Sequence, residues 1–138
     1  MTGKTVVLAV DPGETRIGLA LSDPERRFAL PLAVVERRGD YLAEIAKVVV
    51  ERQVGEIVVG LPRSLKMKET ASTKRAREMA RQIHQACGVE VHLLDERLSS
   101  VQAQRSLADA GHSRRSSKGK TDQVAATIIL QNFLDGAR

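Results

Sequence analysis

Acidic side chains stand at three separated points of this sequence, each where a predicted element begins or ends. Asp11 closes a short apolar run, Asp95 and Glu96 close a later one, and Asp122 stands where the last helix is expected to begin. Parallel strands joined by right-handed crossovers end at the same edge of a sheet, so the first two points are expected to share that edge. A helix that begins there would add the third.

Carboxylates gathered in this way repel one another unless divalent cations neutralise their charge. Mg²⁺ prefers oxygen ligands and keeps several waters, which leaves coordination positions for a phosphate. Two such ions about 4 Å apart activate a water molecule and stabilise the leaving oxygen of a phosphodiester. The acidic points therefore indicate metal-assisted phosphodiester chemistry, with Mg²⁺ or Mn²⁺ as the cofactor.

Each acid also has a purely structural interpretation. Asp11 and Gly13 belong to residue types that favour turns for local backbone reasons. Asp95 could hold Arg97 or cap the following turn, and Asp122 could complement a helix dipole. For any single acid the residues leave both interpretations open. The coincidence of three acidic points on one side of the predicted sheet favours a shared site.

The apolar patterns predict an α/β fold. Strands are expected at Val6–Val10, Ile17–Leu21, Phe28–Val35, Glu56–Pro62 and Val89–Glu96, the first two forming a hairpin with a loop of about five residues. Helices are expected from Asp40 to about Gly55, from about Thr70 to Gly88, from Ser99 to about Ala110, and from Thr121 onward. This order predicts a mixed sheet with helices packed on it, in a single domain spanning residues 1–138.

Composition limits the classes of partner. The net charge of +5 and the pI near 9.8 indicate a polyanionic partner, nucleic acid first. Aromatic residues make up only 2% of the chain, too few for a base-stacking platform, so phosphate contacts are expected to dominate. The single Cys87 excludes an internal disulfide and fits a reducing cytoplasm. No stretch approaches the length of a transmembrane span, so no membrane partner is expected.

Four stretches carry a resemblance to a known family. They are Asp11-x-Gly13 with Arg16–Ala20, Ile57–Pro62, Asp95–Ser99, and Lys118–Asp122 with Ala125 and Ala126. In this order they are similar to the motifs of the YqgF/RuvX family of Holliday junction resolvases and pre-16S rRNA nucleases. The resemblance implies an RNase H-like fold, with a five-stranded mixed sheet in the order 3-2-1-4-5 flanked by helices, and two-metal nuclease chemistry.

The resemblance also implies a set of site residues. Asp11, Glu96 and Asp122 match the catalytic, metal-holding positions, with Asp95 as a substitute for Glu96. Asp95 is the second choice because successive side chains at a strand end point to opposite faces. Basic residues expected to bind nucleic acid are Arg16, Arg63, Lys66, Arg97, Arg114, Arg115, Lys118 and Lys120. The last four lie in the polar stretch Gly111–Thr121, which is expected to be a mobile loop that becomes ordered over the substrate.

The leading hypothesis is a cytoplasmic, metal-dependent nuclease of structured nucleic acid that processes the 5′ end of precursor 16S rRNA. The alternatives are a Holliday junction resolvase and a non-catalytic RNA-binding assembly factor. The protein is expected to be a monomer or a weak homodimer. Nucleotide binding is a further possibility, because Asp11-x-Gly13-x-Thr15 resembles the phosphate loop of actin-like sugar kinases. Those proteins clasp the nucleotide between two such domains, and 138 residues supply one.

Overall fold

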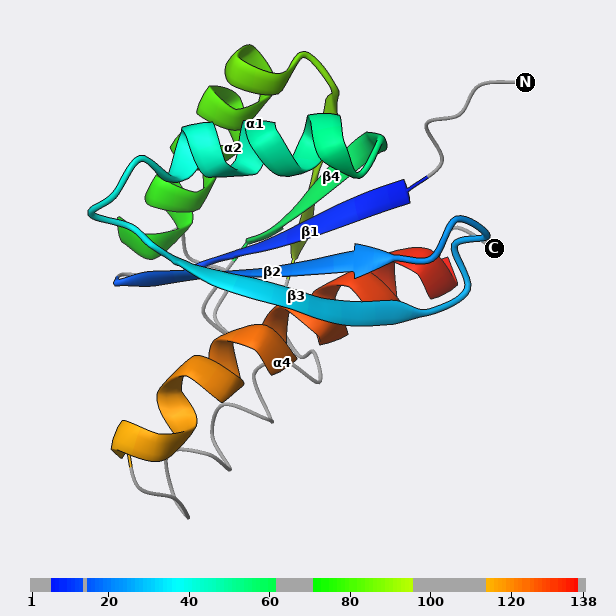
Figure 1. Cartoon of the computed structure of the whole chain (residues 1–138). Coiled ribbons are helices and arrows are strands. Elements are labelled where there is room, and N and C mark those ends of the chain that lie inside the picture. Colours follow the sequence, from blue (N-terminus) through cyan, green and yellow to red (C-terminus); the bar gives the residue numbers. More distant parts are fainter. Residues whose placement is uncertain (1–5, 14, 62–70, 96–113, 137–138) are drawn as a thin grey trace.

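The computed structural model describes residues 6–13, 15–61, 71–95 and 114–136, with backbone alone for 114–123 (Figure 1). Its strands are β1 (Val6–Pro12), β2 (Arg16–Ser22), β3 (Ala29–Glu36), β4 (Val54–Leu61) and β5 (Glu90–Asp95). They form one sheet in the order β3-β2-β1-β4-β5. β1 and β3 run antiparallel to β2, whereas β4 runs parallel to both β1 and β5. The expected mixed sheet and its strand order are confirmed.

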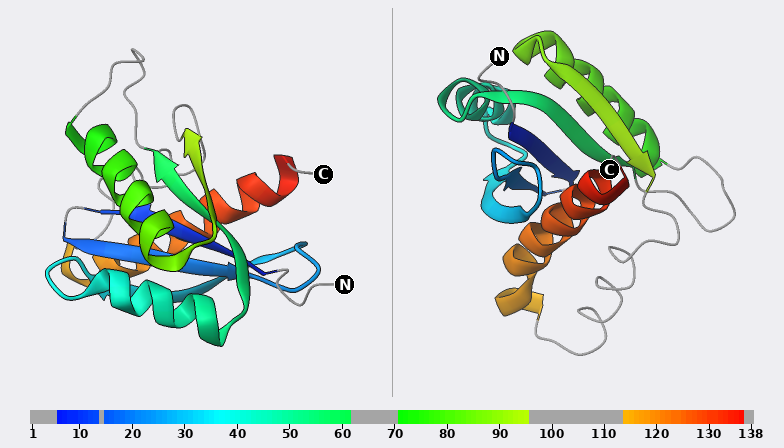
Figure 2. Two further views of the ribbon diagram at one scale, coloured as in Figure 1. Left: turned by 90° about the horizontal axis from the view of Figure 1, so that it is seen from above. Right: turned by 90° about the vertical axis from the view of Figure 1, so that its right-hand side faces the viewer.

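Helices cover both faces of this sheet, as Figures 1 and 2 show. Helices α1 (Tyr41–Glu51) and α2 (Ala71–Cys87) lie on one face, and α4 (Arg114–Gly136) lies across the other. Two apolar clusters fill the space between these layers. The cluster under α1 and α2 includes Leu8, Val10, Ile45, Ile57 and Ile83, and the cluster under α4 includes Val7, Ala9, Ala126, Ile129 and Leu130. None of the described helices combines the length and apolar character needed to cross a membrane.

Several local signals act as the sequence predicts. The Asp40 carboxylate accepts a hydrogen bond from the Ala43 N–H at 3.2 Å, so Asp40 is the N-cap of α1. Gly88 follows α2 with a φ of 71°, and its N–H donates to the His84 carbonyl at 2.9 Å. Pro31 lies in β3, an edge strand of the sheet, which is where proline is tolerated in a sheet.

Two predicted boundaries are wrong. Helix α1 ends at Glu51, and Gln53, with a φ of 55°, turns the chain so that β4 already begins at Val54. The prediction placed this end near Gly55 because glycine is the usual residue at such a turn. The β1–β2 loop spans only residues 13–15, because Pro12 still pairs with Ile17.

The predicted start of the last helix, at Thr121, is also wrong. Helix α4 begins at Arg114, so residues 114–121 are helical and not part of a loop. Arginine and lysine are good helix formers, and the single Gly119 costs only about 1 kcal/mol, which a long packed helix tolerates. Asp122 therefore lies eight residues inside the helix (122 − 114). The helix predicted from Ser99 to Ala110 lies outside the described residues.

Candidate active site

Asp11 is buried near the carboxyl end of the central strand β1, with 1% of its surface exposed. Val7 and Ala9 of the same strand belong to the cluster under α4, whereas Leu8 and Val10 belong to the cluster under α1 and α2. Because side chains alternate along a strand, Asp11 faces α4. A buried carboxylate is costly unless positive charge or hydrogen bonds compensate it. Its burial is thus unlike that of a surface turn former.

Glycines stand on both sides of Asp11 in the sheet. On β2 its partner is Gly18. On β4 the parallel register pairs Val10 with Val59, and one further step brings Gly60 beside Asp11. Neither neighbouring strand therefore contributes a side chain at the level of the carboxylate. The element packed against this face of the sheet is α4.

Position 122 lies in the amino-terminal part of α4, where the backbone alone is described. Ala125 and Ala126 are buried against the sheet, and they follow position 122 by three and four residues. Residues with these spacings share one face of a helix. The amino-terminal turns of α4 (orange) lie on the side of the molecule where β1 ends and β2 begins (Figures 1 and 2), and in Figure 1 they diverge from the sheet. Since the electrostatic effect of a helix end fades within one turn, Asp122 is too far from Arg114 to act as a helix-start charge.

The third acidic point lies at the end of β5, two strands away from β1. This separation corresponds to about 9–10 Å by strand spacing. Leu94 packs with the cluster under α4, so alternation directs Asp95 toward the opposite face. Asp95 and Asp11 thus point to different sides of the sheet. Glu96, the next residue and the preferred candidate, lies outside the described residues.

Arg16 is the one predicted nucleic-acid residue whose side chain falls within the described part of the chain. It opens β2 two residues before Gly18, is partly exposed, and by alternation shares the α4 face with Asp11. Arg63, Lys66 and Arg97 fall outside the described residues. The remaining predicted contacts lie on the first two turns of α4, where the backbone alone is described: Arg114, Arg115, Lys118 and Lys120.

Sequence reasoning missed a contact that fixes the turn after Asp11. The Arg37 guanidinium donates through Nη1 to the Gly13 carbonyl at 2.7 Å. Gly13 itself is required by space, because a Cβ there would collide with the backbone oxygen of Arg16. Arg37 is 24 residues from Gly13 in the chain, so no local pattern could have indicated this contact.

A second polar cluster lies on the face of the sheet that α4 covers, near the end of the sheet where β4 and β5 begin. Ligand atoms of Glu56, Glu90 and His92 lie within 4.8 Å of one another, close enough for one cation. Glu56 is already paired, because Arg26 donates to it at 2.6 Å and His92 Nε2 lies 2.8 Å from its other oxygen. The His92 ring also contacts Phe133 of α4, with ring centroids 5.3 Å apart. His92 is thus half-buried at the edge of the core.

The Glu56 network predicts a loss of stability in acid. Burial alone would raise the pKa of Glu56, but hydrogen bonds from Arg26 and His92 outweigh it and hold the pKa below the ordinary value of 4.5. A carboxyl with a depressed pKa stabilises the fold above its unfolded pKa, and this contribution is lost as the pH falls through the folded pKa. Glu56→Gln should cost about 0.5–1 kcal/mol at pH 7, a small value because solvent screens the partly exposed Arg26.

Urea unfolding of Glu56→Gln and wild type between pH 7 and pH 3 measures this difference, which should shrink toward zero at the acid end. Glu90→Gln is the matched control, because Glu90 is 70% exposed and lies 3.6 Å from His92. Equal losses for the two variants, or a pH-independent loss for Glu56→Gln, would contradict the interpretation.

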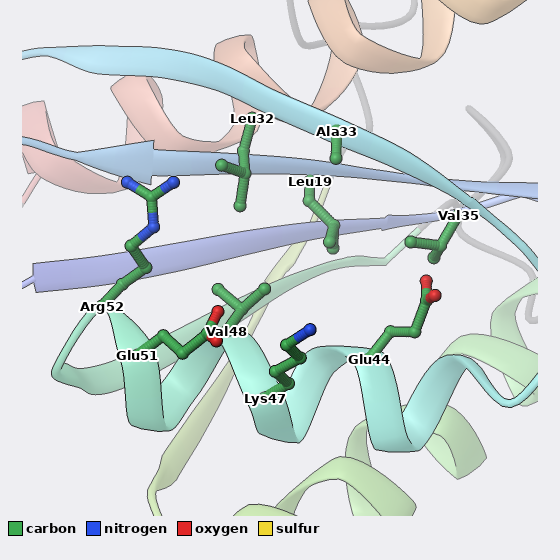
Figure 3. A pocket seen from close by; sticks show the side chains of 9 residues that line it. All are labelled: Leu19, Leu32, Ala33, Val35, Glu44, Lys47, Val48, Glu51 and Arg52. Carbon is green, nitrogen blue, oxygen red and sulfur yellow. The ribbon is translucent and has the colours of Figure 1, made fainter.

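A shallow groove of about 240 Å³ lies between α1 and strands β2 and β3 (Figure 3). Apolar side chains, including Leu19, Leu32 and Val35, form its floor, and charged side chains of α1 form its rim. Leu19 and Val35 belong to the cluster under α1 and α2, so this groove lies on the face opposite to Asp11. It is therefore separate from the candidate active site.

The fold resembles solved structures of resolvases. RuvC from T. thermophilus in complex with a Holliday junction substrate aligns with a TM-score of 0.59 at 19% identity, covering 96% of this chain and 95% of that chain. Fowlpox virus resolvase in complex with Holliday junction DNA aligns with a TM-score of 0.61 at 7% identity, covering 96% and 98%. At these identities the likeness establishes the RNase H-like fold that the sequence predicted.

Relatives with higher identity define the family. A protein from Maridesulfovibrio salexigens is 41% identical over 130 residues, covering 93% of this chain and 96% of the relative. A protein from an Anaeromyxobacter species is 46% identical over 131 residues, covering 94% and 96%. Both carry the name "Putative pre-16S rRNA nuclease". The family model described as RuvX, Holliday junction resolvase, matches residues 5–136, and the chain therefore belongs to the RuvX family.

Proposed function

We propose that this protein is a divalent-metal-dependent nuclease that cuts structured nucleic acid and processes the 5′ end of precursor 16S rRNA. The observation that carries the proposal is the buried Asp11 carboxylate at the end of β1, on the face of the sheet that α4 covers. The nuclease activity itself agrees with the names of relatives more than 40% identical to the chain. This substrate would place the protein in the cytoplasm.

The donor set at this edge suits Mg²⁺ or Mn²⁺, which prefer carboxylate oxygens. Asp11 would supply one ligand, Asp122 another, and Glu96 a third, while Gly18 and Gly60 add no side chain from the two neighbouring strands at the level of Asp11. When bound, a pair of such ions activates water and stabilises the leaving oxygen. The burial of Asp11 supports this assignment, because a desolvated carboxylate gains most from a nearby cation.

The basic residues of the chain would position the substrate. Arg16 shares the face of Asp11 and would hold a phosphate next to the cleaved bond. The first two turns of α4 carry four cationic residues within seven positions, Arg114, Arg115, Lys118 and Lys120. These residues would give the amino-terminal part of α4 a positively charged surface. Such a surface follows a phosphate backbone without reading bases.

Holliday junction resolution is the second candidate. It is favoured by the description of the family model and by the resolvase complexes with the same fold. A resolvase makes two symmetric cuts and so needs two copies of this site in one assembly. The proposed rRNA processing needs only one cut and one copy.

The test is to incubate the purified full chain with a precursor 16S rRNA fragment and, separately, with a four-way DNA junction. The proposal expects cleavage within the 5′ leader of the RNA in Mg²⁺ or Mn²⁺ and none in EDTA. Symmetric cuts in the junction with intact RNA would favour the second candidate. Tight RNA binding without cleavage in either metal would identify a non-catalytic assembly factor and overturn the proposal.

Affinity for nucleic acid is expected to fall steeply with salt. The net charge of +5 and the scarcity of aromatic residues leave phosphate contacts as the main contribution to binding. Several such contacts cost roughly 10³-fold or more in affinity between about 50 and 200 mM salt. Fluorescence anisotropy of a labelled RNA in EDTA, where no cleavage occurs, measures this slope. A nearly flat dependence would contradict phosphate-dominated binding.

A further inference from the structure

Arg37 is the first residue after β3 and makes two contacts with the turn that follows Asp11. Its backbone N–H donates to the Thr15 carbonyl at 3.0 Å. This bond extends the β2–β3 pairing one step beyond the Arg16–Glu36 pair. Its guanidinium donates to the Gly13 carbonyl at 2.7 Å, the one side-chain hydrogen bond of Arg37 within the described residues. Arg37 therefore holds the turn at both of its described residues.

Few other hydrogen bonds restrain the described residues of the turn, 13 and 15. Regular pairing between β1 and β2 ends at Pro12 and Ile17. Beyond this pair, the Gly13 N–H donates to the Asp11 carbonyl at 3.0 Å, which ties the turn back to the residue that carries the carboxylate. Any shift of Gly13 is thus transmitted directly to the backbone of Asp11.

We infer that Arg37 is a positioning residue, which fixes Gly13 and through it the Asp11 carboxylate in the geometry needed to hold a divalent cation. A hydrogen bond from a charged donor to a partly buried carbonyl is stronger than a neutral one, so it restrains the turn effectively. Only the expected effect of Arg37 on cleavage rests on the proposed function. The restraint on the turn is a property of the chain itself.

Three substitutions in the full chain separate positioning from simple charge. Arg37→Ala removes the donor and the charge. Arg37→Lys keeps a cationic donor that can still reach a carbonyl, although it lacks the planar fork of arginine. Arg38→Ala removes the neighbouring positive charge, which is exposed and has no contact with Gly13 among the described residues. Arg38→Ala is therefore the matched control for loss of charge near the site.

Arg37→Ala is expected to lower kcat by about 10- to 100-fold, because displacements near 1 Å in an active site cost up to about 10²-fold. The Mn²⁺ concentration for half-maximal cleavage should rise, since Asp11 is less well placed to bind the ion. Arg37→Lys should restore most of both quantities. Arg38→Ala should leave kcat and the Mn²⁺ requirement unchanged and weaken RNA binding at most by one phosphate contact.

Two measurements without turnover complete the test. Hydrogen exchange of the Gly13 amide should be faster in Arg37→Ala than in wild type and Arg38→Ala, and calorimetric titration should show weaker Mn²⁺ binding. Unchanged exchange and Mn²⁺ affinity in Arg37→Ala, or equal effects of Arg37→Ala and Arg38→Ala, would overturn the inference. If the wild type cleaves no substrate, the proposed function is wrong, and exchange and Mn²⁺ affinity still decide the role of Arg37.

Discussion

Asp11→Asn is expected to reduce cleavage by about a thousandfold or more without unfolding the protein. The amide has nearly the same shape as the carboxylate but carries no charge to hold a divalent cation. Loss of a metal that stabilises transition-state charge forfeits several kcal/mol, and each 1.4 kcal/mol is a factor of ten in rate. Stability in EDTA should hold or rise, because Asp11 is 1% exposed and burying its charge is costly.

Single-turnover cleavage, RNA binding in EDTA and thermal unfolding of the same variant measure these three effects. Asp95→Asn is the matched control, because Asp95 also ends a parallel strand but by alternation points to the face opposite to Asp11. It should retain cleavage. Comparable losses for Asp11→Asn and Asp95→Asn would instead make Asp95 a ligand in place of Glu96.

Asp122→Asn is expected to abolish most cleavage while leaving RNA binding and the fold intact. Position 122 lies in α4 one turn before Ala126, a residue buried against the sheet, and the proposed function makes it a metal ligand. Removing this charge relieves repulsion between carboxylates in the metal-free protein, so stability in EDTA should hold or rise. Binding should persist because lysine and arginine side chains carry it.

Asp135→Asn on the same helix is the control for a general change of helix charge. The Asp135 carboxylate accepts a hydrogen bond from Gln131 at 3.1 Å near the end of α4, far along the helix from position 122. Cleavage by this variant should match wild type. Normal cleavage by Asp122→Asn together with a lowered melting temperature would remove Asp122 from the active site.

The sheet could be predicted from the sequence because its strands are short apolar runs with clear punctuation. Gly60 and Gly88 each stand beside a boundary that the structure confirms. The predicted end of α1 was wrong because Gln53, a residue other than glycine, adopts the positive φ that turns the chain there. The predicted start of α4 was wrong because serine, glycine and basic residues suit both a loop and the solvent-exposed end of a long helix.

Within the candidate site, the position of Asp11 could be predicted from the sequence. The side-chain contacts that hold the surrounding backbone could not. The carboxyl end of a parallel strand next to a β-hairpin follows from local patterns. The contact between Arg37 and Gly13 and the pairing of Glu56 with Arg26 join residues 24 and 30 positions apart. Such contacts depend on the register of the sheet and on the tips of two turns. No pattern in a single sequence specifies them.

The most direct test of the account is anomalous diffraction from crystals grown in Mn²⁺. The account predicts an anomalous peak roughly 2 Å from a carboxylate oxygen of Asp11, with a second ligand from α4 at position 122. The peak should disappear in Asp11→Asn. A peak confined to Glu56, Glu90 and His92, or no ion next to Asp11 at saturating Mn²⁺, would contradict a metal-dependent active site at this edge of the sheet.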